Sequence, residues 1–553
     1  MVIRPFVDST LPFSGTAIQK IEFSDGENTR TLTIPGLAGH SVFLVKVNRS
    51  ASTVGLYNTG HVYTKTEEAE RAFSLSGPLP AVLPEPDAAA RPVSGVFLAG
   101  EETITRYDHD KAQEFNNNPP PRSGTNASRA LPPVLSQAVP GDSREFWVEK
   151  TSGASKPEDW TQITAVLRAQ GNRGNIWIPE EYFIQSGNGR NPRDNKLSSE
   201  QAKLMAEKFD AIYAYTTPIF GYEYGGGVPE TDETYGGIDG DPRIQILIYD
   251  IDFDQSSAQI SGTFGYFWAK DHYGNSASHS NASEIIYMDS YFMDAYTDAI
   301  YSTLAHELQH MIQFNEKDIK KGLPGTETWY NEMLSMLAED MIAPLIGVSA
   351  GNDQHPIKNR IPLFLGYYNY AGITEWRDGN YALISYADVY AFGAYLARNY
   401  GGAELIREIA GNDTADVSSV SQALGKLNPG MTEGYEFEEA LSRYGEVFVY
   451  SGNRLIDGVF SFDRRDTKTI NGIDYTFYEF DIWKMNYTDG GYNVLSSTGY
   501  KGPLVWDLRW AFEMRRSSLI LQSLKEWQGI TGDLVIEAEK PKSDYVDLYL
   551  MIR

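Results

Sequence analysis

The chain has 553 residues, 41% of them hydrophobic and 13% aromatic, so it is large enough for several packed domains and is not a disordered protein. Its 74 acidic residues outnumber 47 basic ones, and the formal net charge of −27 argues against a surface that binds nucleic-acid phosphates or anionic lipid. The sequence contains no cysteine, which excludes disulfides, a cysteine nucleophile and thiolate zinc sites.

Residues 1–112 are predicted to form an N-terminal β-rich domain, because short apolar runs alternate there with Gly, Pro, Asn and Asp. Its strands are expected at residues 31–34, 41–47 and 95–98. Residues 113–143 are rich in Pro, Asn and Ser, a composition typical of an extended linker. This linker is the clearest domain boundary in the sequence.

Residues 144–452 are predicted to form an α+β domain in which a mixed sheet with helices is followed by a helical lobe. A helix is expected over residues 198–216, with Ser198 or Ser199 as its N-cap. Strands are expected at residues 144–148, 162–168, 174–178, 243–249 and 284–288, and later helices at residues 328–346, 381–400 and 434–449.

Residues 453–553 return to a β pattern and are predicted to form a C-terminal domain like a β-sandwich. The expected strands are residues 476–482, 504–508, 518–521, 533–537 and 547–552. The whole chain is therefore predicted to be a multidomain α+β protein with an all-β domain on each side of the α+β domain.

The segment His306-Glu307-Leu-Gln-His310 carries the strongest chemical signal. Residues four apart lie on one face of a helix, so the two imidazoles can hold one metal ion, and Glu307 between them can act on a water at that ion. A zinc hydrolase is the preferred interpretation, and a helix with two histidines by chance is the alternative. An apolar stripe supports the helix and consists of Leu304, Leu308, Met311 and Ile312.

Hydrolytic zinc usually has three protein ligands and a fourth position for water, so a third ligand is expected elsewhere. Glu332 is the preferred candidate, because it lies 22 residues after His310 on a predicted helix that can pack against the first. Glu339 is the competing choice, and Glu327 precedes the helix start. The alternative for Glu332 is a carboxylate that only stabilises the helix N-terminus.

A His-Glu-x-x-His helix followed some twenty residues later by Asn331-Glu332 resembles the gluzincin metallopeptidases. More narrowly, the chain resembles the hyicolysin family of secreted bacterial zinc metallopeptidases over about residues 145–450. The segments that carry this resemblance are residues 265–271, 284–290, 304–312 and 329–340.

The resemblance implies a zincin-like catalytic domain that cleaves protein or peptide substrates as an endopeptidase. It implies Zn²⁺ held by His306, His310 and Glu332, with Glu307 as the general base. Met336 stands where gluzincins have an aspartate four residues after the ligand glutamate. The group that orients a zinc-binding histidine must therefore come from another residue.

Gluzincins also use a downstream tyrosine or histidine to stabilise the oxyanion. Tyr390-Ala-Phe-Gly-Ala is similar to the Tyr-x-x-Gly-Ala helix of the aminopeptidase branch, so Tyr390 is the preferred catalytic tyrosine and Tyr386 the alternative. The chain contains 35 tyrosines, and a packing role is the competing interpretation for each of them.

Two acidic clusters, residues 239–241 and 250–254, suggest Ca²⁺, which prefers several carboxylate oxygens. Neither cluster has a complete loop signature, so a solvated turn is an equal interpretation. His272 and His279 precede the metal-binding helix on a Gly/Ser/Asn loop and could line the rim of the cleft.

Two other functions are compatible with the sequence: an aminopeptidase of the gluzincin type, and a surface adhesion or carbohydrate-binding protein with a vestigial zincin domain. The intact Glu307 argues against the second. No apolar run has the ~18 residues of a membrane span. Residues 1–6 lack the apolar core of a signal peptide. We expect a secreted, cell-surface or periplasmic protein whose export signal has been removed.

Overall fold

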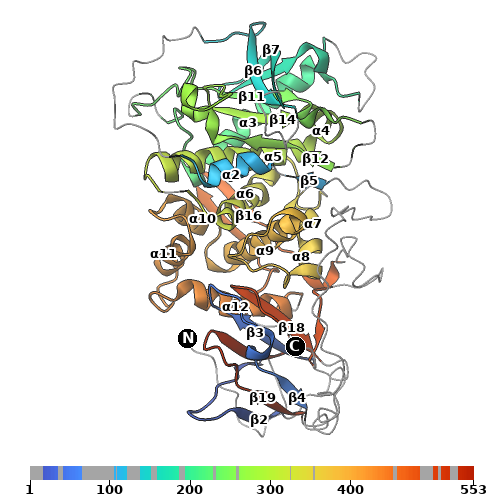
Figure 1. Ribbon diagram of the computed structural model, residues 1–553, viewed down its shortest axis with the longest axis vertical. Coiled ribbons are helices and arrows are strands. Elements are labelled where there is room, and N and C mark those ends of the chain that lie inside the picture. The colour runs from blue at the N-terminus through green and yellow to red at the C-terminus, as the bar shows by residue number, and fades with distance from the viewer. Residues whose placement is uncertain are drawn as a thin grey trace.

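The elements lie in three tiers along the longest axis of the molecule (Figure 1). A sheet with its helices is at one end, a helical tier is in the middle, and a β-sandwich with both termini is at the other end. The computed structural model describes residues 17–34, 41–64, 105–107, 109–120, 137–150, 159–185, 194–227, 229, 232–256, 259, 261–323, 325–352, 355–452, 458–485, 502–508, 512–523 and 534–553.

The sheet of the first tier has six strands in the order β13-β14-β11-β8-β7-β6. Strands β8, β11 and β14 are parallel neighbours, whereas β6, β7 and β13 join antiparallel, so the sheet is mixed as predicted. Its strands are β6 (Ser143–Glu149), β7 (Trp160–Gln170), β8 (Gly174–Pro179), β11 (Ile244–Tyr249), β13 (Gly265–Phe267) and β14 (Ile285–Asp289). Every residue of β11 is buried, because both faces of the sheet are covered.

Two long helices cover one face of this sheet. Helix α3 (Ser199–Phe220) begins at Ser198, whose side chain accepts a hydrogen bond from the Gln201 N–H in a capping box. Helix α5 (Thr297–Gln313) follows the short α4 (Ser290–Ala295) and contacts α3, β13 and β14. Every residue of α5 from Ala299 to Gln313 is buried, which fixes the orientation of its side chains.

The helical tier begins with α6 (Thr328–Ile342), which packs between α5 and α9 (Ala382–Tyr400). A Cβ on Gly393 would lie 2.8 Å from the Met333 Cγ, so the glycine permits the close approach of α9 to α6. The predicted helices 328–346, 381–400 and 434–449 all form. No helix in the described part of the chain combines the length and hydrophobicity needed to cross a bilayer. The other helices of this tier are α7 (Pro356–Asn359), α8 (Ile361–Tyr367), α10 (Gly402–Gly411), α11 (Val417–Leu427) and α12 (Glu436–Tyr450).

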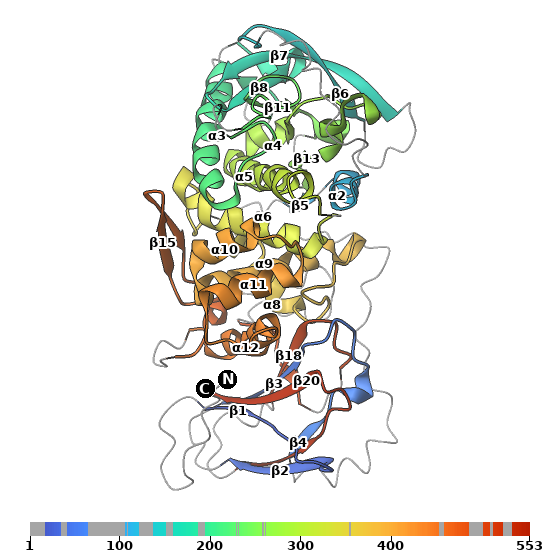
Figure 2. The same ribbon diagram turned by 90° about the vertical axis from the view of Figure 1, so that its left-hand side faces the viewer.

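The β-sandwich is built from both ends of the chain, whereas the sequence was divided into separate N-terminal and C-terminal β domains. One sheet has the order β1-β20-β3-β18-β17 and the other β2-β19-β4 (Figure 2). In both sheets, N-terminal strands therefore lie beside C-terminal strands and form backbone hydrogen bonds with them. The strands are β1 (Ala17–Lys20), β2 (Thr29–Ile34), β3 (Val42–Asn48), β4 (Val62–Thr64), β17 (Trp506–Asp507), β18 (Ser518–Ser523), β19 (Leu534–Glu539) and β20 (Val546–Ile552).

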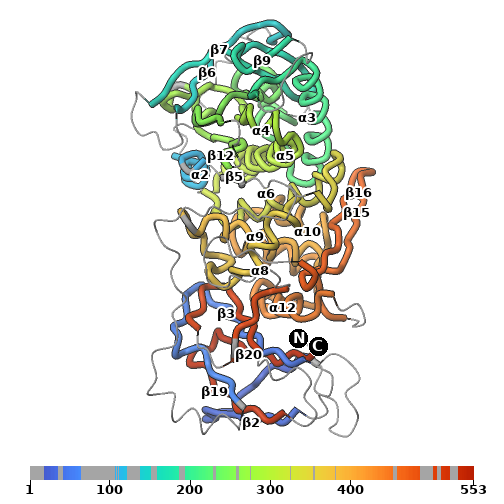
Figure 3. Tube along the Cα trace, turned by 90° about the vertical axis from the view of Figure 1, so that its right-hand side faces the viewer, coloured from blue at the N-terminus to red at the C-terminus, as the bar shows by residue number. Residues whose placement is uncertain are grey.

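The region between the N-terminal strands and the sheet tier departs from the predicted boundary at residue 113. Strand β5 (Thr105–Tyr107) pairs with β12 (Ser261–Thr263), and helix α2 (Asp110–Asn117) follows it. Figure 3 shows α2 beside the elements of the sheet tier and away from the sandwich. The predicted strand 95–98 and linker residues 121–136 lie outside the described residues.

One predicted strand is displaced. Residues 476–482 were expected to be extended, but the strand present is β16 (Ile473–Phe477). It pairs with β15 (Asp466–Ile470) through a two-residue turn at Asn471 and Gly472, both with positive φ. Strand β16 ends at Phe477, and the chain then forms a 3₁₀ turn at Ile482–Lys484 that is capped by Asp481.

Deleting residues 546–553 tests whether the terminal strands form one folding unit. This change removes β20, which pairs with both β1 and β3. We expect the amides of residues 42–48 to lose their protection in hydrogen exchange by at least tenfold, while those of α5 keep theirs. Unchanged protection of β3 would instead support an independent N-terminal domain.

Candidate metal centre

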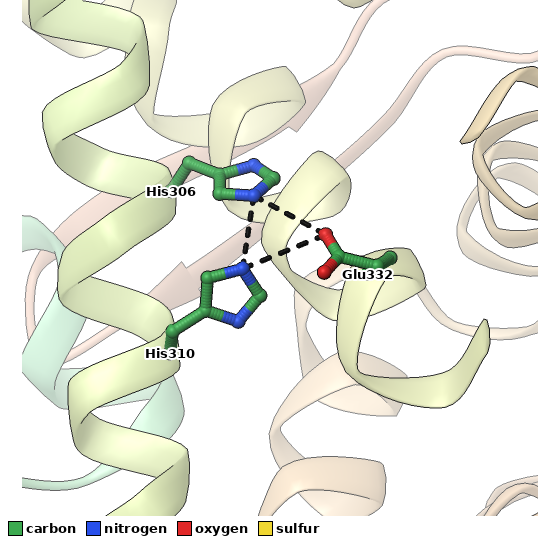
Figure 4. Close-up of side chains that lie close together, drawn as sticks. All are labelled: His306, His310 and Glu332. Atoms are coloured by element: carbon green, nitrogen blue, oxygen red, sulfur yellow. Dashed lines mark hydrogen bonds and ion pairs between the residues drawn. The ribbon is translucent and has the colours of Figure 1, made fainter. Parts of the chain in front are cut away.

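Three side chains from α5 and α6 point toward one another (Figure 4). The His306 Nε2 lies 3.0 Å from the His310 Nε2, and the Glu332 Oε2 lies 3.3 Å and 3.5 Å from these two nitrogens. We call His306, His310 and Glu332 the metal group. Within the described residues, it is the single set of three or more His, Asp or Glu side chains with ligand atoms close enough for one ion.

The metal group fits zinc. Two imidazole nitrogens and one carboxylate oxygen are a donor set that catalytic zinc uses. Three ligand atoms at these separations also need a shared positive charge, from a metal ion or a proton, because their lone pairs would otherwise repel. The three side chains are almost fully buried, so water cannot screen that repulsion.

Both histidines are oriented by contacts at their other ring nitrogen. The Glu339 Oε1 lies 2.8 Å from the His306 Nδ1, and the Asn331 Oδ1 lies 3.0 Å from the His310 Nδ1. An acceptor at Nδ1 places the proton there and leaves the Nε2 lone pair for a metal. Glu339, the competing ligand candidate, thus contacts the ring nitrogen of His306 that faces away from the metal group. It takes the place of the aspartate that gluzincins have where this chain has Met336.

Arg106 joins this network from strand β5. Its Nη2 donates to the Glu339 Oε1 at 2.8 Å, and its Nη1 donates to the Thr303 Oγ1 at 3.2 Å. The pair is buried, so its charge is not screened by solvent. The guanidinium therefore holds Glu339 in place beside His306.

The charges of the network favour the ionised carboxylates. Burial alone would raise the pKa of Glu332, but His310 and His306 hold it well below its usual value. Burial acts in the same direction on Glu339, yet Arg106 and His306 lower its pKa to about 2. Burial disfavours the imidazolium of His310, but Glu332 raises its pKa to about 9. Both carboxylates are therefore charged at neutral pH and can neutralise a cation in the site.

Glu307 lies beside the metal group and beneath the edge strand of the sheet. Its Oε2 accepts a hydrogen bond of 2.9 Å from the Phe267 N–H of β13. It also lines a small cavity of about 20 Å³ together with His310 and Glu332. The hydrogen bond from the edge strand thus holds the Glu307 carboxylate beside the metal group.

The two tyrosine candidates differ in their contacts. The Tyr390 hydroxyl donates to the Asp340 Oδ2 at 2.9 Å and is fully buried. The Tyr386 hydroxyl accepts from the Gln113 Nε2 at 2.9 Å, and the same amide nitrogen donates to the Glu332 Oε1 at 2.9 Å. One side chain therefore links Tyr386 to the metal group, whereas Tyr390 is engaged by Asp340.

The acidic clusters considered for Ca²⁺ make other contacts. The Asp239 carboxylate accepts from the Arg144 Nη1 at 3.2 Å, and Asp241 accepts from the Arg243 Nη1 at 3.1 Å. In residues 250–254, Asp250 lies near other carboxylates, and burial with their charge raises its pKa to about 6. No ligand set of three forms at either cluster among the described residues.

The histidines considered for the rim also have structural contacts. His279 stacks on Trp160 with ring centroids 4.6 Å apart, and His272 is buried near Phe314 and Phe267. His279 is thus half-buried against an aromatic ring, whereas His272 is buried in the core.

Two further functional candidates, Arg106 and Gln113, were missed in the sequence. Both lie at a predicted domain boundary, far in sequence from the metal group, and no local pattern marks them. Asn331 was visible as part of the Asn-Glu pair, but its role at His310 depends on the geometry of α6.

Comparison with known proteins bears on this site. Residues 166–455 match the family described as peptidase M30. The chain is also 28% identical over 329 residues to the neutral metalloprotease ShpI of Staphylococcus hyicus. That alignment covers 56% of this chain and 64% of the relative, so the chain spans less than two thirds of the relative's length. The matched family region includes α5, α6 and α9.

Glu339→Gln tests the orienting contact at His306. Because the neutral amide weakens the pairing with the Nδ1–H, we expect zinc affinity to fall about 10- to 100-fold, as measured by competition with a chelator. The matched control is Glu327→Gln, an exposed residue at the start of the same helix. Equal zinc affinity in the two variants would rule out a role for Glu339 at the metal.

Proposed function

Because this chain belongs to the peptidase M30 (hyicolysin) family, we propose that it is a zinc-dependent endopeptidase that hydrolyses protein substrates. This agrees with the family resemblance found in the sequence. The observation that carries the proposal is the convergence of His306, His310 and Glu332 beside Glu307. Zn²⁺ bound there would polarise a peptide carbonyl and lower the pKa of water.

The roles of the protein groups follow from their contacts. His306, His310 and Glu332 would hold the ion, and Glu339 and Asn331 would hold the two imidazoles in the required tautomer. Glu307 would take a proton from the attacking water and return it to the leaving amine. Its hydrogen bond to β13 keeps the carboxylate at the edge strand, where a substrate backbone would lie.

For stabilisation of the oxyanion, the contacts favour Tyr386 over Tyr390. A hydrogen-bond donor is needed close to the metal group, on the side that the substrate carbonyl would approach. Gln113 joins the Tyr386 hydroxyl to Glu332, so Tyr386 borders the region where a ligand would bind. The bond from Tyr390 to Asp340 gives that residue a structural role.

We also place the protein in a secreted, cell-surface or periplasmic location. An endopeptidase of broad specificity would damage proteins of its own cell. The excess of acidic residues and the absence of cysteine are compatible with folding outside the cytoplasm without disulfides.

Glu307→Gln and Glu332→Ala separate proton transfer from metal binding. We expect Glu307→Gln to retain one zinc per chain but to lose at least about a thousandfold in kcat on casein, because the amide cannot accept a proton. Glu332→Ala should lose the zinc itself, because only two ligands remain.

The measurements are metal content by elemental analysis, casein digestion, and cleavage of an N-terminally blocked peptide. Glu433→Gln, at an exposed position, is the control. Wild-type activity in Glu307→Gln would remove this residue from its role. Failure to cleave the blocked peptide, with cleavage of a free N-terminus, would favour an aminopeptidase.

Tyr386→Phe and Tyr390→Phe distinguish the two tyrosines. We expect Tyr386→Phe to lower kcat by about 10²- to 10³-fold, because a donor to the transition state is lost. Tyr390→Phe should keep kcat but lower the free energy of unfolding by about 1–3 kcal/mol, because Asp340 loses a buried partner. Thermal melts and initial rates decide between them, and the reverse pattern would restore Tyr390 as the catalytic tyrosine.

A further inference from the structure

Helix α2 lies across the metal centre and contacts the edge strand of the sheet. Asn116 is the main contact with that strand: its Nδ2 donates to the Phe267 carbonyl at 2.8 Å, and its Oδ1 accepts from the Ala269 N–H at 2.7 Å. One side-chain amide thus satisfies the carbonyl of the last residue of β13 and an N–H two residues later. The N–H and the carbonyl of one residue in an added extended chain would make the same pair of bonds.

The same helix reaches the metal group and the far wall of the cleft. The Gln113 Nε2 donates to the Glu332 Oε1 and to the Tyr386 hydroxyl, both at 2.9 Å. At its end, the Asn117 Nδ2 donates to the Thr328 Oγ1 of α6 at 2.8 Å. These contacts span the cleft from β13 to α6, so a substrate could not bind while α2 is in place.

Between these contacts, Phe115 projects toward a hollow of about 390 Å³ beside the end of β13. Phe115 packs edge-on against Tyr273 with ring centroids 5.5 Å apart. We call this space the aromatic hollow; its other walls include Trp160, Trp268, Tyr273 and His279. Trp268 directly follows β13, so the hollow lies where a side chain of a strand bound along this edge would enter.

The walls of the aromatic hollow select for apolar groups. The ring of Trp160 stacks on His279, at an angle of 5°. Lys270, the cation at this wall, donates to the Asp271 Oδ1 and to the His279 carbonyl, each at 2.9 Å. Its charge is therefore already neutralised, and an acidic substrate side chain would find no counter-ion there.

We propose that α2 occupies the cleft as an internal substitute for the substrate, and that the aromatic hollow which receives Phe115 is the subsite for a large apolar substrate side chain. This inference rests on the proposed endopeptidase function. The amide of Asn116 takes the place of the substrate backbone, and Gln113 covers the metal group. The preferred substrates are then peptides with Phe or Leu at the position that enters the hollow.

The test uses the full chain loaded with zinc and N-terminally blocked peptides that differ at one position, which is Phe, Leu, Ala or Asp. Gln113→Ala/Asn116→Ala removes the side-chain hydrogen bonds of α2 to Glu332, Tyr386, Phe267 and Ala269, but it keeps Phe115 and the bond from Asn117 to Thr328. We expect kcat/KM of this double variant for the Phe and Leu peptides to be at least about tenfold higher than that of the wild type. The matched control is Glu114→Ala, an exposed residue on the same helix, which should leave kcat/KM unchanged.

A third change tests the subsite. The double variant should cleave the Phe and Leu peptides at least about tenfold better than the Ala peptide. Adding Trp160→Ala should reduce this preference, measured as the ratio of kcat/KM for the Phe and Ala peptides, to less than about threefold. Circular dichroism and zinc content verify that each variant is folded and loaded.

The outcomes are distinct. Chelator-sensitive casein cleavage with no gain, or a loss, in the folded double variant would overturn the inference and leave the proposed function standing. An equal preference for Phe and Ala peptides would also overturn it. If neither the wild type nor the double variant cleaves casein with zinc bound, the proposed function fails and the inference fails with it.

Discussion

The packing of α5 against α6 is the constraint on which the centre depends. It brings two imidazole nitrogens and a carboxylate oxygen within 3.5 Å of one another in a buried place. Such an arrangement is unfavourable unless the three atoms share a positive charge. The surrounding core prevents the helices from moving apart to relieve it. The packing of the helical tier is therefore what keeps these three ligand atoms together.

The network around these atoms extends beyond the two helices. Glu339 comes from the second turn of α6 after Glu332, and Arg106 comes from a short strand paired with β12. The segment that supplies Arg106 continues directly into α2. The same stretch of chain thus contacts Glu339, the partner of His306, and continues into the helix that we propose occupies the cleft.

Much of the fold could be predicted from local patterns. The apolar stripes identified α3, α5, α6, α9 and α12, and Ser198 was visible as an N-cap. Spacing alone favoured Glu332 over Glu339 as the third ligand. In the structure, the Glu332 carboxylate lies beside the Nε2 atoms of both histidines, and the Glu339 carboxylate contacts the Nδ1 of His306. The role of Gln113 could not be read in this way, since it lies 219 residues from Glu332. The choice between Tyr386 and Tyr390 also depends on how α9 is rotated against α6.

The β-sandwich also constrains the order in which the chain can fold during synthesis. Strand β3 has β18 on one side and β20 on the other, so its neighbours leave the ribosome hundreds of residues later. The first strands must remain without their partners while the rest of the chain is made. Contacts between such distant segments also slow folding. The sheet and helical tiers can therefore assemble before β3 meets its partners, and a nascent chain exposes the unpaired edges of β3 until β18 and β20 emerge.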